Sequence, residues 1–466
     1  MRPGTLVLAV VAASLLASAP TPSKLVAGTV LGALKSNNIP GAQLGVIRDG
    51  KALIDDGYGV ASLKTKVPVT PRTRFEIGSL TKQFTAAAIL QLKEQRKLHL
   101  SDALGKYVPE YQRGRNVTIE QLLWQVSGIP DYMHDDNIAQ IASTRRGGIE
   151  AALSLIKNRP LHFQPGSRWE YSNTNYLLLG AIVARVSHMS WEAYLRKNLF
   201  ARAGMTATAF LRDERTMVDA AVGYSGDRSG VLHRPPPLRE GWAGGAGAIV
   251  STVGDLAKWD EAFFSGKVVD AADERLATTA HRLPSGDVDG YGFGWAIDSF
   301  EGQTRIWHNG STFGFSSISE YFPELHEAVV VFINTADATP LAISSPVFDE
   351  LNPEIAAAAR RPVGGESRAI TAIAREWLGR IQSGSFARWQ LTPQANNMYT
   401  PVLIKRLEKQ FAPLGRPQSL VYRGKQTIAS EVVYTYLVRF KEREVMFYLG
   451  LDRDNKITGM YIGRVD

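Results

Sequence analysis

A serine and a lysine three residues apart, Ser79 and Lys82, are the pair in this sequence best suited to covalent chemistry. They lie where a loop is expected to run into an amphipathic helix, which places the hydroxyl at the helix N-terminus and the amine over the same helical face. An amine in a pocket that disfavours its protonated form can accept the hydroxyl proton and make the serine a nucleophile. The helix N-terminus also disfavours the ammonium and offers free backbone N–H groups to an oxyanion. The pair predicts acyl transfer through a serine, without a metal or an organic cofactor.

The Ser-x-x-Lys pattern is a weak signal by itself. The chain has 466 residues, and average residue usage gives roughly one or two chance copies at that length. Ser154 and Lys157 form a second copy, which we interpret as a solvent-facing pair on an ordinary helix. Ser79 differs in its local turn and in the motifs that follow it along the chain.

Two such motifs are Tyr171-Ser-Asn173 and His308-Asn-Gly310-Ser311. A phenol beside an ammonium loses its proton more easily, so Tyr171 is a candidate to relay the serine proton to the leaving group. Asn173 is a candidate donor to a substrate carbonyl and a partner for Lys82. The backbone N–H of Ser311 could join that of Ser79 in an oxyanion hole, with Gly310 allowing a close approach. The alternatives are structural: a buried tyrosine with a turn asparagine, and a structural or surface histidine.

Composition excludes several other classes of protein. Hydrophobic residues make up 44% and charged residues 21%, as in a globular protein, and the net charge of +8 has no dense basic block. We therefore expect no nucleic-acid partner. The chain has no cysteine, which rules out disulfides, cysteine hydrolases and thiolate zinc sites. Neither a His-Glu-x-x-His nor a Gly-x-Ser-x-Gly pattern occurs.

The N-terminus has the pattern of a secretory signal peptide. A basic start is followed by an apolar run at residues 6–16 and by the small residues 17–19. The run is short for a membrane span, although an uncleaved anchor is the alternative. We predict a signal peptide over residues 1–19, a secreted or periplasmic location and no stable membrane span after cleavage.

The remaining chain reads as two α+β units. A helix is expected at 25–35, strands at 42–47 and 51–54 around an Asp49-Gly50 hairpin turn, and a helix at 81–95. A mostly helical stretch at 102–205 precedes strands at 247–251, 293–297, 304–308 and 328–333. This predicts a catalytic domain at residues 20–355 whose sheet adjoins a helical lobe.

A small-residue stretch at 356–367 predicts a linker. The small C-terminal α+β domain predicted at 368–466 has helices at 370–381 and 401–410 and strands at 418–422, 431–441, 444–451 and 456–462. It looks faintly like an NTF2-like cone.

In their order, the three motifs resemble those of the serine β-lactamase and penicillin-binding-protein superfamily, specifically its class C-like branch. The runs at 122–131, 176–180, 244–256 and 310–315 resemble that family too. The resemblance implies an antiparallel sheet flanked by helices plus a helical lobe. It also implies Ser79 as the nucleophile, Lys82 and Tyr171 as general base and acid, and a substrate site shaped by Asn173, His308, Gly310 and Ser311.

The chain departs from the family pattern at its third motif. It has no Lys-x-Gly, and His308 and Asn309 stand where relatives carry lysine and threonine for a substrate carboxylate. A histidine is mostly neutral near pH 7 unless a carboxylate raises its pKa. Gln125-Val126 also replaces a His-Thr pair, with no effect that the sequence reveals.

These departures favour an esterase or a D-amino-acid peptidase acting on a small ester, amide or short peptide. The alternatives are a β-lactamase or D-Ala-D-Ala carboxypeptidase and, from another class, a non-catalytic ligand sensor or scaffold.

Overall fold

The computed structural model describes residues 21–464, apart from 136, 212–218, 228–229, 240, 287 and 429–430. The signal peptide predicted at residues 1–19 lies outside this range. Within it, no helix combines the length and apolar character that crossing a bilayer requires.

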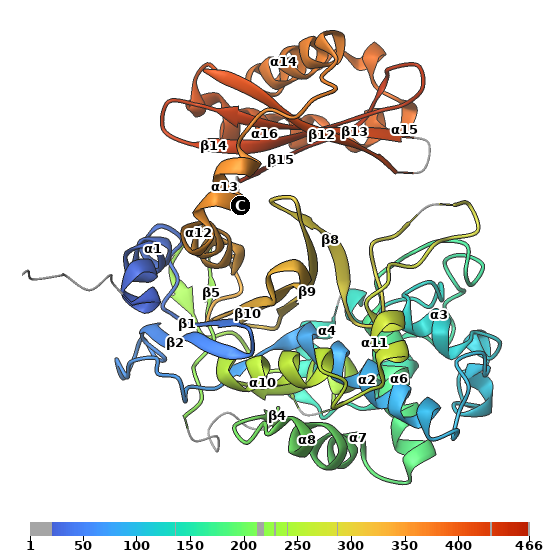
Figure 1. The fold of residues 1–466 in the computed structure, drawn as a ribbon. Helices are drawn as coiled ribbons and strands as arrows, with labels where there is room; N and C mark the ends of the chain where they lie inside the picture. Colours follow the sequence, from blue (N-terminus) through green and yellow to red (C-terminus); the bar gives the residue numbers. More distant parts are fainter. Residues whose placement is uncertain are drawn as a thin grey trace, which may run out of the picture.

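The main sheet has six antiparallel strands in the order β2-β1-β11-β10-β9-β8 (Figure 1). Its strands are β1 (Gly41–Arg48), β2 (Lys51–Gly59), β8 (Ala296–Phe300), β9 (Gln303–Ser311), β10 (Ser316–Phe322) and β11 (Glu327–Ile333). The predicted hairpin turn is confirmed, because Asp49 and Gly50 both have positive φ, at 50° and 71°. Strand β10 was not predicted.

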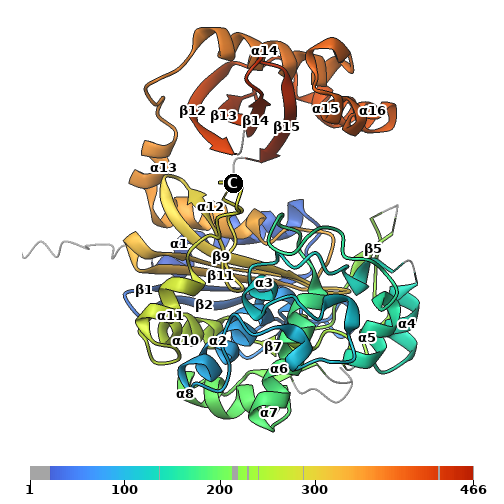
Figure 2. The ribbon, with the colours of Figure 1, turned by 90° about the vertical axis from the view of Figure 1, so that its right-hand side faces the viewer.

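Helices cover both faces of this sheet (Figures 1 and 2). On one face, α1 (Pro22–Ser36) and α12 (Leu341–Leu351) pack over an apolar cluster that includes Val26, Leu44 and Phe348. On the other face, α10 (Val253–Phe264) packs against the central strands. Next to it runs α2 (Thr81–Glu94), which is buried along most of its length. A helix with no exposed face lies inside the core, so its first turn is held from all sides.

The helical lobe is inserted between β2 and β8. Its helices are α3 (Ile119–Leu123), α4 (Ile138–Thr144), α5 (Ile149–Ile156), α6 (Asn173–Ser187), α7 (Trp191–Leu195), α8 (Ala201–Ala203), α9 (Gly244–Gly247) and α11 (Ala271–Ala277). The strand predicted at 247–251 forms as β7 (Ile249–Ser251), but it belongs to a small sheet with β3 (Phe75–Glu76) and β4 (Ala209–Phe210). A further pair, β5 (Ser225–Gly226) and β6 (Leu232–His233), forms a short two-stranded ladder.

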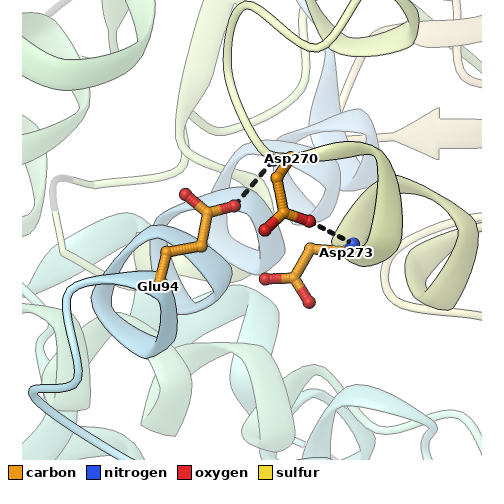
Figure 3. Close-up of side chains that lie close together, drawn as sticks. All are labelled: Glu94, Asp270 and Asp273. Atoms are coloured by element: carbon orange, nitrogen blue, oxygen red, sulfur yellow. Dashed lines mark hydrogen bonds between the residues drawn. The ribbon is translucent and has the colours of Figure 1, made fainter.

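An acidic cluster fixes the C-terminal end of α2 to α11 (Figure 3). Glu94 accepts a hydrogen bond from the backbone N–H of Asp270 at 2.7 Å, and Asp270 caps α11 by accepting from the N–H of Asp273 at 2.8 Å. Asp273 in turn pairs with Lys93 at 2.5 Å. The cluster thus anchors the helix that carries Lys82 near its other end.

The C-terminal part has its own sheet, β12-β13-β14-β15 (Figure 2). It also has its own cluster of buried apolar side chains. Its elements are α14 (Arg368–Ser383), α15 (Pro393–Met398), α16 (Pro401–Phe411), β12 (Ser419–Ile428), β13 (Glu431–Arg439), β14 (Glu444–Leu451) and β15 (Ile457–Arg464). The two predicted helices and four predicted strands all form, but α15 was not predicted and β12 continues well beyond the predicted end at residue 422. The likeness to an NTF2-like cone stays a prediction.

The predicted linker is shorter than expected. Helix α13 (Pro353–Ala359) continues through its first four residues, because an alanine run favours helix and Pro353 occupies the first helical position. Residues 360–367 are not helical. Here Val363 donates to the Tyr422 carbonyl at 3.3 Å, and Arg423 donates to the Arg361 carbonyl at 2.7 Å.

We expect a truncated chain of residues 20–364 to fold without the C-terminal part. The apolar cluster of that part is distinct from the two clusters of the rest of the chain, so truncation would remove few core contacts. Gel filtration and thermal unfolding of the truncated and full chains test this. Aggregation of the shorter chain would show that the C-terminal part completes the main core.

Candidate active site

Ser79 lies in a single 3-10 turn, Gly78–Leu80, directly before α2. Gly78 has φ of +50°, and a Cβ there would lie 2.7 Å from the backbone nitrogen of Ser311. Only glycine suits such a position, since any side chain would meet the backbone of β9. The turn therefore brings Ser79 next to Ser311, as an oxyanion hole made of their two N–H groups requires.

Lys82 is the second residue of α2 and is fully buried. Its Nζ is 2.9 Å from Ser79 Oγ, 2.9 Å from Asn173 Oδ1 and 2.9 Å from the Ala246 carbonyl oxygen. Burial lowers the pKa of Lys82 to about 7, and the opposing charge of Asp131 limits the shift. The structure thus brings the amine of Lys82 into contact with the hydroxyl of Ser79, as predicted.

Tyr171 is adjacent to this pair, with Lys82 Nζ 4.8 Å from the centre of its ring and a hydrogen bond to Ser79. The expectation that a neighbouring ammonium makes this phenol more acidic is wrong. Burial raises the pKa of Tyr171 above its ordinary value, and the charge of Asp131 adds to that effect. Tyr171 is a neutral phenol at pH 7, which suits a proton donor to the leaving group.

Asn173, the first residue of α6, joins the pair to a carboxylate. Its Oδ1 accepts from Lys82, and its Nδ2 donates to Asp131 Oδ2 at 2.8 Å. The predicted contact with Lys82 is present, and donation to a substrate carbonyl stays a prediction. Sequence reasoning missed Asp131, because a single aspartate after a turn proline has no distinguishing spacing.

His308, predicted to shape the substrate site, is buried and is not among the described residues that line the cavity in front of Ser79. Its Nδ1–H donates to the Asn309 carbonyl oxygen at 2.5 Å, and its Nε2 accepts from the hydroxyl of Tyr291 at 3.0 Å. Burial lowers the pKa of His308 to about 3, as does the nearby Lys82, so the ring is neutral. Its ring centre is 6.1 Å from that of Tyr171. The histidine therefore supports the ring of Tyr171, and Tyr291 is a second residue that the sequence did not reveal.

Gly310 and Ser311 follow in the same strand. A Cβ on Gly310 would lie 2.0 Å from the carbonyl oxygen of Ile77, which confirms that this position needs a close backbone approach. Ser311 is exposed and lines the cavity in front of Ser79.

Gln125 supports the loop that carries the second motif. Its Oε1 accepts from the backbone N–H of Ser172 at 3.1 Å and from Asn175 Nδ2 at 2.6 Å. Gln125, which departs from the family pattern, therefore has a structural role: it holds the backbone between Tyr171 and Asn173.

The cavity in front of Ser79 has a volume of about 480 Å³. Its wall combines the site residues with aromatic and aliphatic side chains, and none of the described lining residues carries a charged side chain at neutral pH. They are Ser79, Tyr132, Met133, Trp169, Tyr171, Asn173, Leu238, Ala243, Ala246, Gly247, Asn309, Ser311, Thr312 and Phe313.

The second Ser-x-x-Lys copy is solvent-facing, as predicted. Ser154 and Lys157 are both exposed, and the serine hydroxyl donates to the Ala151 carbonyl at 2.7 Å.

Residues 26–349 match the protein family described as Beta-lactamase. "Protein flp" of Staphylococcus aureus is 30% identical over 312 residues, covering 65% of this chain and 61% of that protein. The chain thus spans less than two thirds of that relative's length. A solved structure of an octameric penicillin-binding protein homologue from Pyrococcus abyssi has a TM-score of 0.63 at 22% identity and covers 94% of this chain and 99% of its own.

The D-amino acid amidase from Ochrobactrum anthropi has a TM-score of 0.61 at 20% identity, covering 72% of this chain and 98% of its own. The matched family region includes Ser79, Lys82, Tyr171 and the strand β9 that borders them. The chain therefore belongs to the Beta-lactamase family.

Proposed function

We propose that this protein hydrolyses esters or amides without a carboxylate group, in the manner of an esterase or a D-amino-acid amidase or peptidase. The observation that carries this is the 2.9 Å contact of Lys82 Nζ with Ser79 Oγ at an uncharged cavity. The reaction proceeds through an acyl-enzyme on Ser79.

In the first half of the reaction, the free amine of Lys82 takes the proton of Ser79 while Oγ attacks the substrate carbonyl. The backbone N–H groups of Ser79 and Ser311 stabilise the oxyanion. Tyr171, which keeps its proton at neutral pH, donates to the leaving alcohol or amine, and the protonated Lys82 then restores the phenol. In the second half, the same residues act in reverse. They take a proton from a water molecule as it attacks the acyl-enzyme, and they return a proton to Ser79 Oγ as the acid is released.

The cavity favours an uncharged and partly apolar acyl group. Tyr132, Met133 and Phe313 form an aromatic and aliphatic wall, and no cation among the lining residues faces a substrate carboxylate. His308 is buried and neutral, so it supplies no charge. A carboxylate entering this cavity would lose its water without gaining a partner. Penicillins and peptides ending in a free carboxylate are therefore disfavoured, and the amidase fold relative supports amides as one substrate class.

Purified protein tests the proposal against a substrate panel. We expect turnover of nitrophenyl esters with benzoyl or phenylacetyl groups or of D-phenylalanine amide, and little turnover of a chromogenic cephalosporin. A fluorophosphonate should label Ser79, while Ser79→Ala should lose both labelling and turnover and Ser154→Ala should lose neither. Rapid cephalosporin hydrolysis would favour a β-lactamase, and an unlabelled wild type would favour a ligand sensor.

A further inference from the structure

A buried carboxylate, that of Asp131, is connected to the Ser79–Lys82 pair through Asn173. Asp131 is 4% exposed and caps the short 3-10 turn Tyr132–His134, accepting from the backbone N–H of Met133 at 2.9 Å. Its other oxygen accepts from Asn173 Nδ2 at 2.8 Å. Both oxygens are thus engaged, one by the backbone and one by the active site.

This carboxylate determines which way the Asn173 amide points. An ionised carboxylate only accepts hydrogen bonds, so the amide must turn its nitrogen towards Asp131. Its oxygen then faces Lys82 Nζ at 2.9 Å, and Lys82 faces Ser79 at the same distance. A continuous line of hydrogen bonds leads from Asp131 through Asn173 and Lys82 to the nucleophile.

Asp131 is also the charged group whose field affects the pKa of Lys82. The other titratable groups around the amine are Tyr171 and Tyr176, whose rings lie 4.8 and 5.6 Å from Nζ, and His308. Burial raises the pKa of both tyrosines and lowers that of the histidine, so all three are neutral near pH 7. The negative charge of Asp131 favours the ammonium and opposes the effect of burial.

We propose that Asp131 is a positioning residue of this hydrolase, which aims the Asn173 oxygen at Lys82 and holds its negative charge behind the amine. The inference rests on the proposed function, because it concerns the same serine and lysine.

The test is the rate of Ser79 labelling by a fluorophosphonate as a function of pH. In the wild type the rate should rise through about pH 7, where Lys82 becomes the free amine. Asp131→Asn removes the charge and keeps one acceptor oxygen, so one of the two hydrogen bonds is lost. We expect its midpoint to move down by roughly one pH unit. Its plateau rate should fall roughly 10- to 100-fold, since the Asn173 amide is no longer held.

Two variants serve as controls. Asp131→Glu keeps the charge, so the midpoint of its pH profile should lie close to that of the wild type. Asp135→Asn removes a nearby carboxylate that pairs with Arg159 at 3.1 Å outside the cavity, and its profile should match the wild type. Should Asp131→Asn not fold, Asp131→Ser retains a good cap for the Met133 N–H while removing the charge, and it should show the same lowered midpoint.

The outcomes separate the two proposals. A slower variant whose midpoint equals that of the wild type would overturn the role of Asp131 and leave the hydrolase intact. A wild type that does not label at Ser79 would overturn the proposed function itself.

Discussion

Lys82→Ala is expected to slow acylation of Ser79 by at least about 10³-fold, because the variant has no group to take the serine proton. Lys82 Nζ is the amine in contact with Ser79 Oγ, and burial has already lowered its pKa to about 7. Tyr171 cannot replace it, since burial raises the pKa of the phenol. The half-time of fluorophosphonate labelling measures the loss directly.

The matched control is Lys157→Ala, which removes the lysine of the exposed Ser-x-x-Lys copy and should leave labelling unchanged. Circular dichroism of both variants distinguishes lost chemistry from lost structure. Labelling of Lys82→Ala at the wild-type rate would remove this lysine from the mechanism.

Gly310→Ala is expected to lower kcat/KM by about 10²- to 10³-fold, the usual loss when one oxyanion donor is misplaced. The added Cβ would lie 2.0 Å from the Ile77 carbonyl oxygen and 2.5 Å from Ser317 Oγ. The carbonyl belongs to the residue before the turn of Ser79, so it cannot yield without moving that turn away from β9. Overpacking of this kind also costs about 1–3 kcal/mol of stability.

Steady-state kinetics with a nitrophenyl ester and a thermal melt measure the two effects of Gly310→Ala. Gly459→Ala is the control, because this glycine also lies in a strand but has no atom within 4 Å of the added Cβ. A Gly310→Ala enzyme with wild-type kcat/KM would show that the approach of β9 to Ser79 does not matter for catalysis.

Local sequence signals predicted the pairing of Ser79 with Lys82 and the helix that begins directly after the turn of Ser79. Ser79, Lys82 and Asn173 lie together as expected because short motifs fix hydroxyl, amine and amide within one helix turn or at one helix start. The hairpin at Asp49-Gly50 and most of the C-terminal strands were equally predictable, since turn residues and alternating apolar residues are local.

Properties that depend on burial could not be predicted in the same way. Strand β10 was not predicted because two serines, Ser317 and Ser319, interrupt its apolar pattern. Both are buried, and they donate to the Ile77 carbonyl and to Asp260. The neutral state of Tyr171 and the orientation of His308 depend on residues far away in the chain, such as Tyr291 and Asp131. The sequence shows that these residues are present, but not that the fold brings them together.

The pairing of β1 with β11 joins residue 44 to residue 331 at the centre of the main sheet. During synthesis, the amino-terminal hairpin must therefore wait for its partner while the ribosome makes the intervening chain, roughly tens of seconds at ordinary elongation rates. Throughout that interval the hairpin has an open edge that can pair with another chain. Completion of the sheet is then a late folding step dominated by long-range contacts, and folding of this protein should be slow compared with that of a helical bundle.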